Sequence, residues 1–196
     1  MKQPARPELV GSWVRLVILA GLVGAALGGH SALADSSATK ENQVKAAFLF
    51  NFAKFIEWPA QSFAAPDSPF VIAVLTSSAA GASFGEELAR IVKDRRLNGR
   101  EVVVKQTVLP TEAVASQMLF APSSEEALLP RLREAMKDRP VLMVGESPEC
   151  LRMGGVIVFV SEGDKLRFEI NAARADEVGL KISAQLQKLA LAVHRP

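Results

Sequence analysis

The sequence predicts a single α/β domain with three layers, in which helices cover both faces of a mostly parallel sheet of about six strands. Two observations support this fold class. Short apolar runs rich in β-branched residues alternate with segments of helical periodicity, and this alternation is typical of parallel sheets. Two later strand-like segments are separated only by Glu162-Gly163-Asp164, which predicts an antiparallel hairpin near the carboxyl end.

The first predicted element is a helix over residues 42–58, which Pro59 would end. Its apolar residues recur at spacings of three and four: Val44, Ala47, Phe48, Phe52, Phe55 and Ile56. Phe50 and Leu49 make the apolar stripe wider than one core face normally needs. Burial in the core is the favoured interpretation, and a second buried surface against a partner is the alternative.

The first half of the sheet follows from residues 70–105. The continuous apolar run at 70–76 is typical of a buried strand, and the spacing at 81–94 predicts the helix after it. Asn98-Gly99 marks a turn, and the β-branched run at 101–105 predicts the second strand.

The middle of the chain predicts a third strand at 117–121 and a helix at 124–137 that Ser123 is placed to cap. A fourth strand at 140–144 leads through a loop or short helix to Gly154-Gly155. This glycine pair is interpreted as a sharp turn into the fifth strand, residues 156–160.

The last third of the chain begins with the strand 165–170, in which Leu166, Phe168 and Ile170 share one face. Asn171 is expected to cap a short helix that reaches Val178 and is closed by Gly179. A final helix is predicted from about residue 182 to residue 193.

The first 34 residues predict an export signal. Lys2, Arg6 and Arg15 form a basic start, residues 16–29 are uncharged and largely apolar, and Ala32-Leu33-Ala34 offers small residues for cleavage after Ala34. The working domain is then the exported part of the chain, residues 35–196. An uncleaved anchor is the less favoured alternative, because a membrane span needs about 20 apolar residues. The apolar run is not followed by the cysteine that a lipoprotein anchor requires.

Charge and composition exclude several functions. Removing Lys2, Arg6 and Arg15 from the 23 basic residues, and Glu8 from the 21 acidic ones, leaves 20 of each. A general nucleic-acid binder would retain a basic surplus. The exported chain would contain one histidine, His194, and one cysteine, Cys150, which are too few for a conventional zinc site. We therefore expect no enzyme, metal or cofactor. Burial of Cys150 is favoured over a disulfide between two chains.

Two places in the sequence could bind a ligand or partner. The loop 76–85 lies between a strand and a helix, where anions often bind, but it lacks a phosphate-loop lysine and is expected to be an ordinary connection. The second place gathers Arg167, Glu169 and Asn171 beside Lys181 and Ser183. By itself, this second group is typical of a solvated strand face with a capped helix.

Several motifs make the chain resemble the YfiR/HmsC-like family of small periplasmic regulators. The matching segments are residues 44–59, 84–88, 118–120, 154–157, 167–171 and 179–183. The resemblance implies a repressor, without enzymatic activity, that binds the periplasmic sensor domain of an inner-membrane diguanylate cyclase and keeps cyclic di-GMP and biofilm matrix low. It also implies a homodimer, sequestration by an outer-membrane lipoprotein, and a small-molecule pocket near the last strand and helix.

On this resemblance, we expect Arg167, Glu169, Asn171, Lys181 and Ser183 to form a polar recognition patch, with Phe55 and Trp58 as apolar contacts. The chain departs from the family in its cysteines. Members often carry pairs, one of them just before the third strand, where this chain has Ser116. Control by an internal disulfide is therefore not expected.

Two other functions remain open from the sequence. One is a small-solute receptor domain, which the loop 76–85 would serve. The other is a carboxylate-dependent hydrolase that uses Glu169. The hydrolase is the weakest hypothesis, because no second Asp or Glu stands at a matching spacing.

Overall fold

A computed structural model describes residues 40–195. The chain divides into two units, Met1–Glu41 and Asn42–Pro196, and the second unit contains the α/β domain. The predicted signal peptide and its cleavage after Ala34 lie outside the described residues. Within the described range, no helix combines the length and apolar character needed to span a bilayer.

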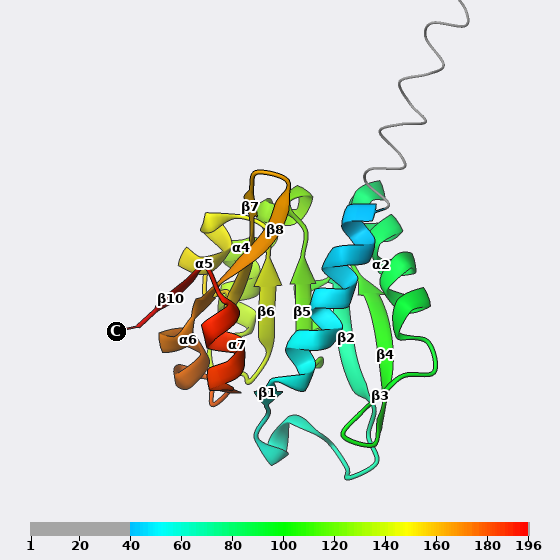
Figure 1. Ribbon diagram of the computed structural model, residues 1–196. Helices are drawn as coiled ribbons and strands as arrows, with labels where there is room; N and C mark the ends of the chain where they lie inside the picture. The colour runs from blue at the N-terminus through cyan, green and yellow to red at the C-terminus, as the bar shows by residue number, and fades with distance from the viewer. Residues whose placement is uncertain (1–39, 196) are drawn as a thin grey trace, which may run out of the picture. The chain divides into compact units, whose positions relative to one another are not determined.

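The domain is built on an eight-stranded sheet in the order β10-β8-β7-β6-β5-β2-β4-β3 (Figure 1). The strands are β2 Phe70–Leu75, β3 Arg96–Leu97, β4 Arg100–Thr107, β5 Met118–Ala121, β6 Leu142–Gly145, β7 Ile157–Glu162, β8 Lys165–Asn171 and β10 Ala192–His194. Adjacent strands are parallel except for β7 with β8 and β3 with β4. The predicted α/β class and the antiparallel hairpin are confirmed, and the short strands β3 and β10 enlarge the sheet.

Helices cover both faces of this sheet. They are the helix over residues 40–54, α2 Ala79–Val92, α3 Pro110–Ala113, α4 Leu129–Ala135, α5 Pro148–Arg152, α6 Ala172–Glu177 and α7 Ala184–Leu189, with the 3₁₀ turns η1 Ala60–Ser62 and η2 Ser123–Leu128. Successive residues of a central strand point to opposite faces of the sheet and pack into the hydrophobic core on that face. In β2, Ile72 and Val74 pack with the first helix and α2, whereas Ala73 and Leu75 pack with α3 and α4. This period of two explains why the central strands are apolar throughout.

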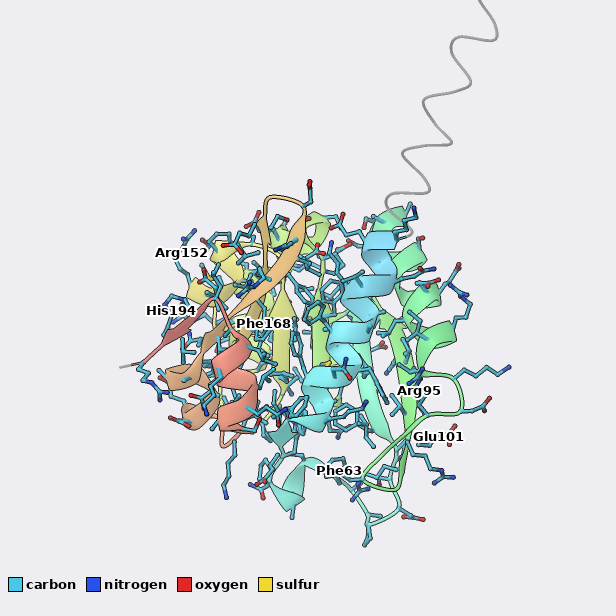
Figure 2. The ribbon with its side chains drawn as sticks, in the orientation of Figure 1. Phe63, Arg95, Glu101, Arg152, Phe168 and His194 are labelled. Atoms are coloured by element: carbon cyan, nitrogen blue, oxygen red, sulfur yellow. The ribbon has the colours of Figure 1, made fainter. Side chains whose placement is uncertain are left out.

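The first helix is held to the sheet by aromatic side chains. Phe52 is 1% exposed and contacts Phe48, Phe159 and Phe168, whose ring centroids lie 5.7, 5.7 and 4.9 Å away. Phe168 projects from β8 into this cluster (Figure 2). Core burial therefore accounts for most of the wide apolar stripe, as favoured from the sequence.

A partly buried ion pair fastens the same helix to the end of β6. The distance from Lys45 Nζ to Glu146 Oε1 is 2.5 Å, and the two side chains are 13% and 14% exposed. Glu146 Oε2 also accepts a hydrogen bond from the Ser123 backbone N–H at 2.7 Å. The carboxyl group thus joins the first helix to the segment that follows β5.

The first helix ends at residue 54, four residues earlier than predicted. The chain then forms β1, Ile56–Glu57, which pairs antiparallel with β9, Lys181–Ile182. Two causes end the helix before Pro59. Trp58 precedes Pro59, and a residue before proline disfavours helical geometry. In addition, the Trp58 indole N–H donates a hydrogen bond to Gln117 O at 2.9 Å, which holds this part of the chain beside the start of β5.

The predicted helix 124–137 was wrong in its first half. Residues Ser123–Leu128 form the 3₁₀ turn η2, and the α-helix α4 begins at Leu129. Pro130 has no N–H to donate to the preceding turn, so one α-helix cannot run through this position. Ser123 makes no side-chain cap.

The final helix is also shorter than predicted. It ends at Leu189, and β10 then runs parallel to β8. The Leu191 N–H donates to Phe168 O at 2.8 Å, so the outer edge of β8 is paired rather than open to solvent. The predicted cap at Asn171 is confirmed, since its Oδ1 accepts from the Arg174 backbone N–H at 2.9 Å.

Candidate functional site

Three of the predicted site residues, Arg167, Glu169 and Asn171, lie on β8. Lys165, Arg167 and Glu169 alternate with the inward Leu166, Phe168 and Ile170, as the sequence predicted. Arg167 Nη1 lies 3.5 Å from Glu162 Oε2, and Glu169 Oε2 lies 2.8 Å from His194 Nε2 on β10. We call Arg167, Glu169 and His194 the outer-strand patch; Figure 2 shows His194 at this edge of the sheet.

His194 was not predicted as a site residue, because a position two residues from the chain end is often poorly ordered. No sequence signal revealed that the last residues would form a strand beside β8. The parallel pairing places His194 opposite Asn171 and brings its imidazole to Glu169.

A second group of predicted residues meets where β1 pairs with β9. Lys181 lies opposite Glu57, and the Ser183 N–H donates to Phe55 O at 2.9 Å. Ser183 Oγ accepts from the Leu186 N–H at 3.2 Å and thereby caps α7. We call Phe55, Lys181 and Ser183 the β1–β9 ribbon. Its Lys181 side chain is exposed, whereas Phe55 packs partly against the core.

Trp58 lines a hollow of about 290 Å³ on the same domain. Its ring meets Phe70 edge to face, with the centroids 4.9 Å apart, and the Arg100 guanidinium lies 3.9 Å from the centroid of Phe63. The indole N–H is already used by Gln117 O. Trp58 therefore helps to hold the fold together, and the rest of its surface faces the hollow.

The seven predicted residues are thus divided among four places, one of which is the hollow that Trp58 lines. Arg167 and Glu169 belong to the outer-strand patch, while Phe55, Lys181 and Ser183 belong to the β1–β9 ribbon. Asn171 begins α6 and faces a cleft of about 500 Å³ between α4, α5 and α6. The structure does not join the seven residues into one continuous surface.

The loop after β2 is occupied by a carboxyl group of the protein itself. Glu125 is fully buried, and its Oε1 accepts from the Ser78 backbone N–H at 3.0 Å while its Oε2 accepts from the Ser77 hydroxyl. A Cβ on Gly81 would lie 2.5 Å from Leu75 O, so this close packing requires glycine. The geometry supports an ordinary connection at residues 76–85.

Cys150 is buried and free, as favoured from the sequence. Burial, and to a lesser degree the negative charge of Glu126, raises the pKa of its thiol to about 12. A Cβ on Gly155 would lie 2.6 Å from the Cys150 sulfur, and one on Gly145 would also collide with it. The glycines therefore leave room for this side chain. Ser116 is also buried, and its hydroxyl donates to Ala113 O at 2.5 Å.

We expect the native Cys150 thiol to resist Ellman's reagent at pH 8, because both burial and protonation suppress attack by the thiolate. Its reactivity should appear when urea unfolds the chain, which Ellman's reagent can follow. The pKa of the thiol is therefore higher in the folded state than its ordinary value of 9.0, which we take for the unfolded chain. Its contribution to stability should therefore fall as the pH rises from about 9 to about 12. Equal labelling with and without urea would contradict the prediction.

Within residues 40–195, no group of three or more His, Cys, Asp or Glu side chains is arranged to hold a metal ion. The hydrolase hypothesis gave the catalytic role to Glu169. In the structure, the carboxylate of Glu169 contacts the imidazole of His194.

Comparison with known sequences decides the family. The sequence pattern described as YfiR/HmsC-like matches residues 42–191, which is most of the chain. The chain belongs to the YfiR/HmsC-like family. No curated protein matches this YfiR/HmsC-like chain.

Solved structures similar to this YfiR/HmsC-like protein include two with low identity. A conserved domain protein from Vibrio cholerae O1 biovar El Tor is 13% identical, with a TM-score of 0.47 over 63% of this chain and 54% of its own. An ABC domain in complex with L-Trp from Streptococcus pneumonia is 14% identical, with a TM-score of 0.46 over 65% of this chain and 55% of its own. The chain spans about half the length of both structures.

Proposed function

We propose that this protein is a periplasmic repressor that binds the sensor domain of an inner-membrane diguanylate cyclase and keeps cyclic di-GMP synthesis low. The observation that carries the proposal is the family match, which covers residues 42–191 and therefore every strand of the eight-stranded sheet except β10. In this role the protein acts by contact and catalyses no reaction.

The outer-strand patch is the favoured contact surface. Arg167 and Glu169 are 38% and 25% exposed, so a partner can reach both. β8 is hydrogen-bonded on both sides, to β7 and β10, and therefore presents these side chains from a rigid support. Exchanging their exposed ion pairs for pairs with a partner costs little, because each is worth about 0–1 kcal/mol.

The β1–β9 ribbon supplies a second part of the proposed contact. Lys181 is exposed and can pair with an acidic side chain of the cyclase, while Ser183 also caps α7. Phe55 and Trp58 would add apolar contact through their exposed edges. A homodimer, and release of the cyclase when an outer-membrane lipoprotein sequesters the repressor, complete the proposal.

Loss of the protein should raise cellular cyclic di-GMP and surface attachment severalfold in a strain whose partner cyclase is intact. Wild-type protein should reverse this, and Arg167→Glu or Lys181→Glu should not, because each places a repelling charge in the contact. Lys93→Glu is the matched control: Lys93 is an exposed lysine at the end of α2, outside both surfaces.

Cyclic di-GMP measured by mass spectrometry, together with periplasmic levels of each variant, separates lost repression from lost protein. Unchanged cyclic di-GMP after deletion would contradict the proposal. Full repression by both charge-reversal variants would contradict the assigned surfaces but not the repressor function.

A small-solute receptor is the second candidate, favoured by the hollow beside Trp58. Aromatic rings of Phe63 and Phe70 and the cation of Arg100 surround it, a combination suited to a planar, negatively charged molecule. Native mass spectrometry of protein from its own periplasm would show a bound molecule that Arg100→Ala loses.

A further inference from the structure

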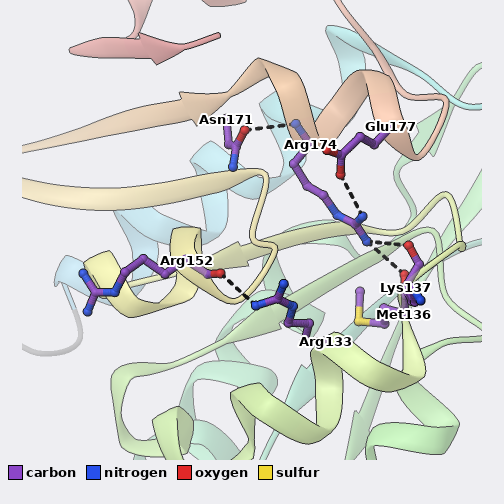
Figure 3. A network of polar contacts seen from close by, with 7 residues as sticks. All are labelled: Arg133, Met136, Lys137, Arg152, Asn171, Arg174 and Glu177. Carbon is purple, nitrogen blue, oxygen red and sulfur yellow. Dashed lines mark hydrogen bonds and ion pairs between the residues drawn. The ribbon is translucent and has the colours of Figure 1, made fainter. Parts of the chain in front are cut away.

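The cleft between α4, α5 and α6 is separate from the surfaces proposed to bind the cyclase. It measures about 500 Å³, and Figure 3 shows the polar contacts that link the segments around it. Cationic side chains line the cleft from two sides. Arg133 lies in α4 and Lys137 just after it, whereas Arg174 lies in α6. The volume falls within the range of pockets that take molecules of metabolite size.

Arg174 is fixed in position at the wall of this cleft. Its Nη2 donates hydrogen bonds to the backbone oxygens of Met136 and Lys137 at 3.1 and 2.8 Å, and its Nη1 donates to Glu177 Oε2 at 3.1 Å. Only 17% of the Arg174 side chain is exposed. A guanidinium carries five N–H groups, so these three bonds leave two for a ligand.

Gly154 keeps the space beside Arg174 open. Its backbone has a φ of +92°, which glycine adopts without strain, and a Cβ there would lie 3.5 Å from Arg174 Nε. A longer side chain at this position would cover the guanidinium. The Nε–H of Arg174 therefore faces a gap in the wall of the cleft.

Arg133 approaches the same space from the other side. Its Nη1 lies 3.5 Å from Arg152 O, and Figure 3 shows the Arg133 guanidinium directed toward α5 and the segment before β7. The Arg152 guanidinium instead pairs with Glu149 and points away from the cleft. Asn171 uses its Oδ1 to cap α6, which leaves its amide N–H₂ as a further donor at the cleft.

The acidic residues at this site do not cancel its positive charge. Glu177 is paired with Arg174, and Glu134 is the second carboxylate at the cleft. Arg133, Lys137 and Arg174 outnumber these two acids, although the predicted exported chain as a whole carries equal numbers of basic and acidic residues.

We propose that this cleft binds a small oxyanion, whose carboxylate or phosphate group lies between the guanidinium groups of Arg133 and Arg174 with Lys137 beside it. Planar guanidinium groups match both kinds of oxyanion with paired hydrogen bonds, and the fixed Arg174 loses little freedom on binding. The binding is a property of the isolated domain and does not rest on the proposed repression of a cyclase.

Isothermal titration of the purified protein at low ionic strength tests the site with pyrophosphate and citrate as probes, one for each oxyanion source. At least one should bind saturably, and the double variant Arg133→Gln, Lys137→Gln should weaken that binding at least tenfold. The control Lys93→Gln, Lys188→Gln removes the same charge from exposed positions on α2 and α7.

The nitrogen-edited NMR signal of Arg174 Nε–H gives a direct second readout and should shift on titration with the bound probe. Saturable binding of neither probe would overturn the proposal. Equal weakening in the two double variants would overturn it as well, since binding would then follow net charge and not this cleft.

Discussion

Replacing Phe52 by alanine is expected to lower the free energy of unfolding by about 4 kcal/mol, because deleting a buried phenylalanine costs about 3–5 kcal/mol. Phe52 is 1% exposed, and three other rings surround it, including Phe168 at 4.9 Å between centroids. Phe52 belongs to the first helix and packs on Phe159 and Phe168 of the paired strands β7 and β8, so its removal leaves a cavity that the surroundings fill only in part. Urea unfolding measures the change, and the thermal midpoint should fall by about 8–16 °C.

Val44→Ala is the control on the same helix. Val44 is 45% exposed, so its replacement should change the free energy of unfolding by no more than about 0.5 kcal/mol. A loss below about 1 kcal/mol for Phe52→Ala would show that the aromatic cluster does not hold the helix to the sheet.

Replacing Glu125 by leucine is expected to cost about 3 kcal/mol, although the side chain stays similar in size. The Ser77 hydroxyl and the Ser78 N–H would lose the carboxyl oxygens that accept their hydrogen bonds. Ser77 is exposed, so its hydroxyl can turn to water, and the loss falls mainly on the partly buried Ser78 N–H. A buried donor left without a partner costs about 1–3 kcal/mol. The end of β2 would thereby separate from η2, and thermal unfolding followed by circular dichroism should show a fall of about 6–12 °C.

Glu125→Gln keeps an acceptor oxygen and should cost less than half as much as the leucine variant. The exposed Glu101, on β4, provides the control, since Glu101→Gln should leave the midpoint almost unchanged. A leucine variant as stable as the wild type would mean that the strand-end loop does not depend on this carboxyl group.

The fold class could be predicted because its evidence is local. The apolar run at residues 70–76 requires burial on both faces, and the alternation of Leu166, Phe168 and Ile170 requires one buried face. Such patterns indicate strands whatever their neighbours are. The end of the first helix could not be predicted as well, since the pairing of β1 with Lys181–Ile182 joins residues far apart in the chain.

The sequence indicated which residues are candidates for the site, but not which of them share a surface. Arg167 and Glu169 follow from strand periodicity, and they share one face of β8 as predicted. Lys181 and Ser183 are near them in sequence, but α6 turns the chain back so that they meet Phe55. Sequence proximity therefore joined residues that the fold separates.

The buried role of Glu125 and the cleft at Arg174 had no sequence signal. A glutamate in the first turn of a predicted helix is normally a solvated residue that favours the helix dipole. Only the packing of η2 against the end of β2 shows that its carboxyl group serves two serines. Arg174 likewise depends on α4 ending beside α6, which brings two backbone oxygens to its guanidinium.

The sequence by itself determined the α/β class, the order of most elements, the inward face of β8 and the family motifs. These follow from side-chain chemistry and period, which act over a few neighbouring residues. The tertiary structure alone decided where β10 pairs, which residues share a surface, and which charges lie buried. Those outcomes depend on contacts between segments distant in the chain, because the free energy of burial belongs to the packed pair and not to either segment.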